Sequence, residues 1–389
     1  MAPIHSKQTL LALALALAFV SVVAARGEAL PAARHERWMA KYGRVYADAA
    51  EKLRRREVFA ANARHIDAVN RAGNRTYTLG LNQFSDLTNE EFAETHLGYR
   101  HQPGGLAPAA AVNVSMAQLQ STLPDSVGWR ARGAVTPVKY QGHCASCWAF
   151  AAVAATEGLV QIATGNLIPM LEQQVLDCTG GANSCKSGHV NAALTYITAS
   201  GGLQTEAAYA YGAKQGACRS GGLGPNPAAS VGVHRSVTLH GDEGALQALV
   251  ASQPVAVAVE ADADFHHYRS GVYVGSPSCG RNLHHAVTVV GYGADGGAGG
   301  QEYWVVKNQW GATCASRAGT ATTAAWPPTP TTPPWTPLEN HISSPCSIEY
   351  GLSASYRTMQ LQYHVNVRIY GFWFLDNEHR KHGMMRSPM

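Results

Sequence analysis

The sequence predicts an α+β protein in which a helical leading segment precedes a larger mixed domain. Residues 51–70 carry a side-chain stripe with the period of an α-helix. Residues 147–163 form an apolar, alanine-rich stretch typical of a buried helix, and residues 282–293 have the β-branched content of a strand. Glycine turns separate these segments, as expected where helices and strands alternate in one domain.

The composition fits a globular chain and indicates no charged partner. The hydrophobic fraction is 46%, and 30 Lys and Arg against 26 Asp and Glu give a formal net charge of +4. This charge is too small and too scattered to predict binding to nucleic acid or to an anionic membrane.

The first residues have the pattern of a secretory signal peptide. A basic start at Lys7 precedes an apolar run over residues 10–23 that ends in small residues. The run is shorter than the roughly 20 residues of a membrane-spanning helix. We expect residues 1–25 to be removed and the eight cysteines to meet an oxidising compartment, where disulfides form. The tripeptides at Asn74 and Asn113 fit the N-glycosylation pattern.

Composition divides the rest of the chain into four parts. Residues 26–100 are rich in charged residues and helix formers, and residues 101–122 form a loose linker rich in glycine, proline and alanine. Residues 123–311 make the main domain. Residues 312–389 change abruptly to an Ala/Thr-rich and then Pro-rich tail without a clear period.

Cys144 and Cys147 lie just before the apolar helix. From their spacing alone, a redox pair and half of a zinc site both stay open. A second Cys-x-x-Cys is absent from the sequence. A cysteine at a helix N-terminus lies beside unpaired N–H groups and the positive end of the helix dipole, which favours the thiolate. Cys147 is therefore a candidate nucleophile.

Several motifs carry a resemblance to a known family. The spacing of the stripe in residues 51–70 indicates only that this helix packs against something, but its six residues form a signature: Glu51, Arg55, Phe59, Asn62, Ile66 and Asn70. Residues 80–86 follow the pattern Gly-x-Asn-x-Phe-x-Asp, and residues 141–150 read Gln-Gly-His-Cys-Ala-Ser-Cys-Trp-Ala-Phe. On these motifs the chain resembles papain-like cysteine protease precursors of the cathepsin L-like branch and plant type.

The resemblance implies an architecture. Residues 26–122 would be an inhibitory propeptide of the I29 type, with its trailing segment in the active-site cleft in the non-cleavable direction. Residues 123–311 would be a papain-like peptidase domain, with a helical lobe to about Gly232, a β-rich lobe after it and the cleft between them. Such a chain is made as a zymogen and cut near Thr122. The family implies no cofactor and no metal.

The resemblance also assigns catalytic roles. Cys147 would be the nucleophile, and His285 would pair with it and protonate the leaving amine. Asn308 would orient the His285 ring, while Trp310 shields their hydrogen bond from water. Gln141 would donate its side-chain amide to the oxyanion together with the Cys147 N–H.

Substrate-binding positions follow from the same resemblance. Gly188 would pair with the backbone of an extended substrate, and Trp310 would lie beside the cleft. A mostly apolar pocket predicts a preference for bulky hydrophobic side chains, and its expected lining is His189, Val190, Ala258, Leu283 and Ala286.

The other histidines receive no catalytic role. His284 neighbours His285, and because side chains alternate along a strand only one of the two can face the thiolate. We therefore expect a structural or substrate-side role for His284. His266 and His267 are expected on the surface or on a pocket wall.

Disulfides are implied by the family as well. Cys144 would pair with Cys185 and Cys178 with Cys218, which would stabilise the lobe that carries the nucleophile. Cys279 has no partner in a recognisable context.

The tail departs from the family pattern, because the closing strands expected after Gly311 do not appear. We expect residues 312–389 to be disordered or to reflect a frame shift or a mis-spliced gene model. A β-rich lobe without those strands exposes sheet edges and loses core area.

Three functions remain open. The chain predicts a cysteine endopeptidase of the secretory pathway, in a vacuole, lysosome or extracellular space. It would act as a monomer on proteins and peptides, with its own propeptide and cystatin-type inhibitors as partners. The alternatives are a catalytically impaired homologue with a binding or inhibitory role, and a thiol–disulfide oxidoreductase that uses Cys144 and Cys147.

Overall fold

The computed structural model describes most of the leading segment and of the main domain. The described residues are 31–100, 123–179, 183–206, 210–219, 243–277, 279, 282–295 and 301–311, and the backbone of short strands at 236–238, 325–326 and 351–353. The expected signal peptide, the linker at 101–122 with Asn113, and nearly all of the tail lie outside these residues.

The leading segment, called the prodomain below (residues 31–100), is helical. A helical segment covers residues 31–42 and precedes α2 (Ala49–Ala72), β1 (Tyr77–Leu79) and α3 (Asn89–His96). Asp48 caps α2 by accepting from the Glu51 N–H, and α2 ends at Gly73 in a left-handed conformation. Thr88 and Glu91 form a capping box at α3.

The predicted stripe on α2 faces the chain that follows it. Phe59 packs with Trp38 in a small prodomain core. The Asn62 side chain donates to the carbonyls of Ser85 and Leu87 at 3.0 and 2.9 Å. Asn70 bonds in the same way to the backbone of β1. These polar residues therefore fix the path of residues 79–87 against the helix.

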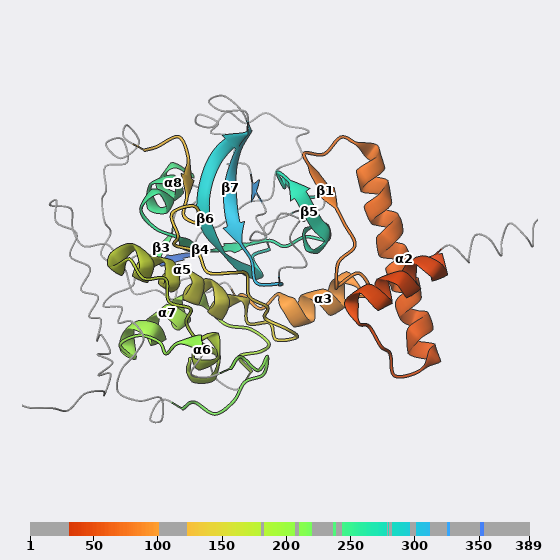
Figure 1. Ribbon diagram of the computed structural model, residues 1–389, viewed down its shortest axis with the longest axis horizontal. Coiled ribbons are helices and arrows are strands. Elements are labelled where there is room, and N and C mark those ends of the chain that lie inside the picture. The colour runs from red at the N-terminus through yellow and green to blue at the C-terminus, as the bar shows by residue number, and fades with distance from the viewer. Residues whose placement is uncertain are drawn as a thin grey trace, which may run out of the picture.

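The helical lobe of the main domain is built around α5 (Cys147–Thr164), with α6 (Glu172–Cys178) and α7 (Val190–Ala199) packed on it (Figure 1). By length and composition α5 could cross a membrane, but 67% of it is buried as the core helix of this lobe. Disulfides join Cys144 to Cys185 and Cys178 to Cys218, the pairs that the resemblance implied. Cys279 also takes part in a disulfide.

The β-rich lobe contains a five-stranded sheet in the order β2-β6-β7-β8, in which β4 also pairs with β6, along residues 285–289. Its strands are β2 (Val127–Gly128), β4 (Val255–Val259), β6 (His285–Asp295), β7 (Gln301–Lys307) and β8 (Ala325–Trp326). The lobe also holds α8 (Glu243–Ser252), the 3-10 turn η2 (Phe265–His267) and β5 (Tyr268–Gly271). Another pair joins β3 (Ser236–Thr238) to β9 (Gly351–Ser353). Two tail segments, β8 and β9, are thus placed as strands.

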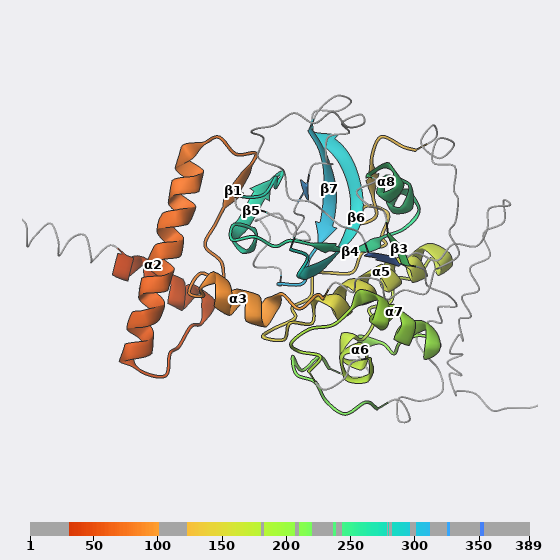
Figure 2. The ribbon, with the colours of Figure 1, turned by 180° about the vertical axis from the view of Figure 1, so that it is seen from behind.

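The prodomain docks on the β-rich lobe through shared secondary structure. Strand β1 pairs antiparallel with β5, and α3 leads from this contact toward the start of α5 (Figure 2). Next to that ladder the Gly80 N–H donates to the His267 carbonyl at 2.8 Å, and the Asn82 side chain donates to the His266 carbonyl. The Gln83 amide reaches the Trp310 carbonyl at 2.8 Å. Residues 80–86, which carry the Gly-x-Asn-x-Phe-x-Asp pattern, therefore form part of the surface by which the prodomain docks.

Arg55 should contribute more to prodomain stability than its neighbour Arg54. Both pair with Glu51 and Glu91, but Arg55 also donates to the Asp86 carbonyl, and its side chain is 17% exposed against 47% for Arg54. We expect Arg55→Gln to lower the free energy of unfolding by about 1–3 kcal/mol, because the carbonyl of the buried Asp86 loses this charged donor. The matched Arg54→Gln should lower it by less, because solvent screens the exposed ion pairs of Arg54. Urea unfolding of the precursor measures both, and equal losses would contradict this assignment.

Candidate active site

The predicted nucleophile lies at the junction of the two lobes. Cys147 is the first residue of α5 and is fully buried. It is the free cysteine among the described residues, since the neighbouring Cys144 is held in a disulfide. The disulfide fixes the segment before α5, so the thiol has a defined position at the helix N-terminus.

His285 and Asn308 meet where β6 begins and β7 ends. The His285 Nε2 and Asn308 Oδ1 are 3.0 Å apart, and the Gln309 N–H also donates to Oδ1 at 2.9 Å. Since Oδ1 acts as an acceptor there, Nε2 carries the proton, which leaves a lone pair on Nδ1. Nδ1 is buried and has no hydrogen-bond partner within the described residues. Trp310 stacks on the His285 ring with centroids 4.7 Å apart.

The backbone beside His285 contacts the thiol directly. The Ala286 N–H is one of the backbone donors to Cys147 Sγ. The strand that carries the imidazole therefore touches the helix that carries the sulfur, although the two residues are far apart in sequence.

The prodomain occupies the cleft at these atoms. The Gly98 N–H donates to Cys147 Sγ at 3.3 Å. Gln141 uses its side-chain amide to donate to the His96 carbonyl at 3.2 Å and to the Cys144 carbonyl at 2.9 Å. The His96 carbonyl of the prodomain thus accepts from the Gln141 amide, which is the group expected to donate to the oxyanion.

Beyond Gly98 the chain continues along Gly188. The bridge between Tyr99 and Gly188 is parallel, with Gly188 N–H donating to the Gly98 carbonyl at 2.8 Å and Arg100 N–H donating to the Gly188 carbonyl at 3.0 Å. The Tyr99 N–H donates to the His284 carbonyl at 3.0 Å. The backbone of His284 therefore holds the prodomain chain.

Some of the expected pocket residues pack against this segment or bond to it. Tyr99 packs against the apolar cluster that contains Val190 and Ala286. Ala258 is opposite Ala286 in the β4–β6 ladder, and His189 Nδ1 donates to the Arg100 carbonyl at 2.7 Å. Leu283 is buried as well.

Burial keeps the reacting pair neutral in this form of the protein. It raises the pKa of the Cys147 thiol to about 11, despite the backbone N–H groups that lower it. It also lowers the pKa of His285 to about 3, although the bond to Asn308 acts in the opposite direction. The covered site therefore holds a thiol and an imidazole rather than an ion pair.

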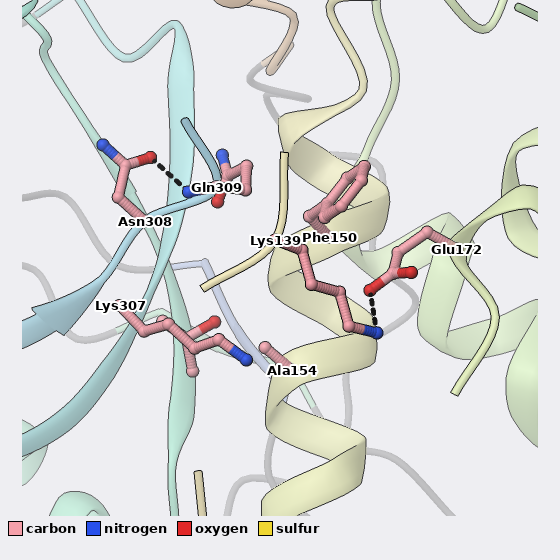
Figure 3. Close-up of a pocket in the computed structure, with 8 residues that line it drawn as sticks. Lys139, Phe150, Ala154, Glu172, Lys307, Asn308 and Gln309 are labelled. Carbon is pink, nitrogen blue, oxygen red and sulfur yellow. Dashed lines mark hydrogen bonds and ion pairs between the residues drawn. The ribbon is translucent and has the colours of Figure 1, made fainter. Parts of the chain in front are cut away.

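A buried group of charges lies near Asn308, at the cavity drawn in Figure 3. Lys139 Nζ donates to Glu157 at 2.9 Å and to Glu172 at 2.8 Å, and Lys307 lies 3.5 Å from Glu157. Burial raises the pKa of Glu172. These ion pairs join the helical lobe to the end of β7, and no local motif indicated them.

Two histidines that were expected on the surface or on a pocket wall are covered in the precursor. His266 and His267 are buried beneath the prodomain, at 3% and 2% exposure, rather than on the surface. Phe92 of α3 stacks on His266 with centroids 4.5 Å apart and on His96 at 4.7 Å. Within the described residues His266 Nε2, both ring nitrogens of His267 and His96 Nε2 have no hydrogen-bond partner. Docking of the prodomain therefore encloses uncharged imidazoles.

Comparison with known proteins identifies the class. Residues 123–321 match the family described as papain family cysteine protease, and residues 35–92 match the cathepsin propeptide inhibitor domain (I29). The chain therefore belongs to the papain family of cysteine proteases, and it is an endopeptidase precursor with its own inhibitory propeptide. The peptidase match extends beyond Gly311, where we placed the end of that domain.

Curated plant proteases and solved precursors are similar over most of the chain. The senescence-specific cysteine protease SAG39 of Oryza sativa subsp. indica is 44% identical over 75% of this chain and 85% of its own length. Ananain of Ananas comosus is 41% identical over 71% of this chain and 77% of its own. The structure of a recombinant stem bromelain precursor matches with a TM-score of 0.69 at 37% identity, over 83% of this chain and 97% of that one. These likenesses confirm the predicted papain-like α+β fold and its prodomain.

Gly98 should be essential for covering the thiol. A Cβ at this position would lie 1.6 Å from the Ala145 carbonyl oxygen, so a side chain must push the prodomain away from Cys147. We expect Gly98→Ala to speed labelling of Cys147 in the intact precursor by an epoxysuccinyl peptide. Gly128→Ala is the control, because a Cβ there meets no atom within 4 Å. Equal labelling of the two variants would contradict the predicted steric contact.

Proposed function

We propose that the chain hydrolyses peptide bonds through Cys147, His285 and Asn308 once its prodomain has been removed. The observation that carries the proposal is the arrangement around His285. Its Nε2 donates to Asn308, its Nδ1 is left as a base, and the next N–H along the strand contacts Cys147 Sγ. An imidazole with this tautomer can accept the thiol proton.

The reaction begins with transfer of the Cys147 proton to His285 Nδ1. The thiolate attacks the scissile carbonyl carbon and forms a tetrahedral oxyanion, which accepts from the Gln141 amide and the Cys147 N–H. The imidazolium then returns its proton to the leaving amine, and an acyl-enzyme remains. Water attacks this thioester with His285 as base, which releases the acid and restores the thiol.

Inhibition by the prodomain rests on direction and on burial. An extended substrate that runs antiparallel to Gly188 would have the opposite direction to the prodomain chain, whose bridge with Gly188 is parallel. The prodomain also excludes water from the thiol and the imidazole, which disfavours their ion pair. Cleavage near Thr122 would release both constraints.

The preference for a bulky hydrophobic side chain stays part of the proposal. Its support is Tyr99, a large ring that packs against the cluster with Val190 and Ala286.

We further propose that the enzyme works as a monomer in the secretory pathway, in a vacuole, a lysosome or the extracellular space. Cystatin-type inhibitors would fit the same cleft.

A second candidate function is a catalytically impaired homologue with a binding or inhibitory role. The observation that favours it is the outer edge of β7, where the described residues of β8 pair only with Trp304 and Val305. An incompletely paired strand beside Asn308 would weaken the support of the site.

Reaction of the processed protein with an epoxysuccinyl peptide separates these functions. We expect labelling at Cys147, loss of labelling in His285→Ala and hydrolysis of a peptide substrate by the unmodified chain. Gln141→Ala should lower kcat by about 10²-fold or more, because one oxyanion donor is lost. Folded, processed protein that is neither labelled nor active would leave the impaired homologue as the function. Reversible oxidation between Cys144 and Cys147 would instead favour the oxidoreductase.

Acid should release the prodomain. Burial lowers the pKa of His267 to about 4 and that of His96 to about 3, and it lowers the pKa of His266 as well. These groups bind protons more tightly when exposed, at an ordinary pKa of about 6.5. The stability of the docked state is therefore fully present above about pH 6.5 and is lost as the pH falls toward 4.

The variant His267→Phe tests this prediction, because it keeps a ring and removes a titrating group without a hydrogen bond among the described residues. The groups that face His267 are His266, His65 and Asp264. We expect the pH of half-maximal opening, followed by Cys147 labelling of the precursor, to move to lower pH. The control Asn166→Gln lies at an exposed position whose hydrogen bonds are made to Thr164, away from the prodomain, and it should leave the midpoint unchanged. An unchanged midpoint in His267→Phe would contradict the assignment.

A further inference from the structure

Gln309 uses three polar groups to connect the segments of the proposed active site. Its N–H donates to Asn308 Oδ1 at 2.9 Å, and its carbonyl accepts from the Gln141 N–H at 2.9 Å. Its side-chain Nε2 donates to the Ala286 carbonyl at 3.0 Å. The side chain is buried, and it lies beside Asn308 at the cavity in Figure 3.

The side-chain bond replaces a missing ladder bond. The β6–β7 ladder ends with Thr288 opposite Lys307. In the same antiparallel register Val287 would lie opposite Asn308, and Ala286 would lie opposite Gln309. Strand β7 stops at Lys307, so the Gln309 amide reaches across to the Ala286 carbonyl where a backbone donor would otherwise stand.

Ala286 links this bond to the nucleophile. In an antiparallel strand the N–H and the C=O of one residue point to the same side. At Ala286 the N–H donates to Cys147 Sγ, and the C=O accepts from Gln309. Movement of the carbonyl would therefore also move the N–H at the sulfur and the adjoining His285.

We propose that Gln309 is a positioning residue, and this inference rests on the proposed peptide hydrolysis. Its amide holds the start of β6 so that His285 and the Ala286 N–H keep their places at Cys147. Its own backbone at the same time fixes the Asn308 acceptor and the segment of the oxyanion donor Gln141. Within the part of the chain that the structure describes, the hydrogen bonds of Gln309 reach no reacting atom.

The test compares Gln309→Glu and Gln309→Leu with the matched control Gln174→Glu. Gln174 is also buried, in α6, where its amide donates to the Tyr196 hydroxyl at 3.2 Å. Each variant is made as the full precursor and is cut in residues 101–122 by the same added protease. Hydrolysis of a peptidyl coumarylamide gives kcat and KM, and the rate of Cys147 alkylation by iodoacetamide is measured against pH.

We expect both Gln309 variants to lose about tenfold or more in kcat, with KM close to that of the unmodified chain, because a buried acceptor loses its donor. Alkylation near neutral pH should slow as well. In Gln309→Glu the introduced carboxyl can donate to the Ala286 carbonyl only when protonated. The losses in kcat and in alkylation rate of Gln309→Glu should therefore become smaller as the pH falls, whereas those of Gln309→Leu should not.

The alkylation profile separates this inference from the proposed function. An unmodified chain that is alkylated at Cys147 but hydrolyses nothing contradicts the proposed function, and the variants' alkylation profiles still decide the role of Gln309. The inference is overturned if both Gln309 variants match Gln174→Glu in kcat and in alkylation at every pH. Failure of both to fold while the control folds would also overturn it, since Gln309 would then be a folding residue.

Discussion

The arrangement depends on one buried junction, where the N-terminus of α5 meets the first residues of β6. Cys147 belongs to the helical lobe and His285 to the sheet, and the Ala286 N–H at Cys147 Sγ is the direct contact between them. Neither lobe can shift without changing this contact. Two further contacts act at the same junction. The Lys307–Glu157 ion pair joins the end of β7 to α5, and the Gln309 carbonyl, which accepts from the Gln141 N–H, joins it to the segment before α5.

The prodomain uses the same junction to keep the site inactive. The Gly98 N–H donates to Cys147 Sγ, and the His96 carbonyl accepts from the Gln141 amide. The groups that would bind a substrate are therefore already occupied. Because the prodomain also excludes water, it shifts the pKa values of the thiol and the imidazole away from an ion pair. A helix N-terminus favours the thiolate, but in the precursor the desolvation of Cys147 outweighs that effect.

Sequence alone predicted what local chemistry dictates. The stripe from Glu51 to Asn70 has a helical period, and a cysteine at the start of an apolar helix is recognisable as a nucleophile, so the fold class and the candidate nucleophile could be stated in advance. The roles of His285 and Asn308 came from the family resemblance. The family resemblance supplied the pairing of the cysteines. The burial of His266 and His267 could not be predicted, because it results from a prodomain more than 160 residues away in the chain. Gln309 was missed because its bond to Ala286 becomes visible only when the register of β6 and β7 is known.

The central claim is that prodomain removal allows Cys147 and His285 to form an ion pair. The most direct test is the ultraviolet absorbance of the thiolate, measured against pH in the precursor and in the processed protein, with Cys147→Ser as the blank. The account predicts no thiolate signal in the precursor at mildly acidic pH and a clear signal in the processed protein, which His285→Ala abolishes. An identical thiolate titration in the two forms would contradict it.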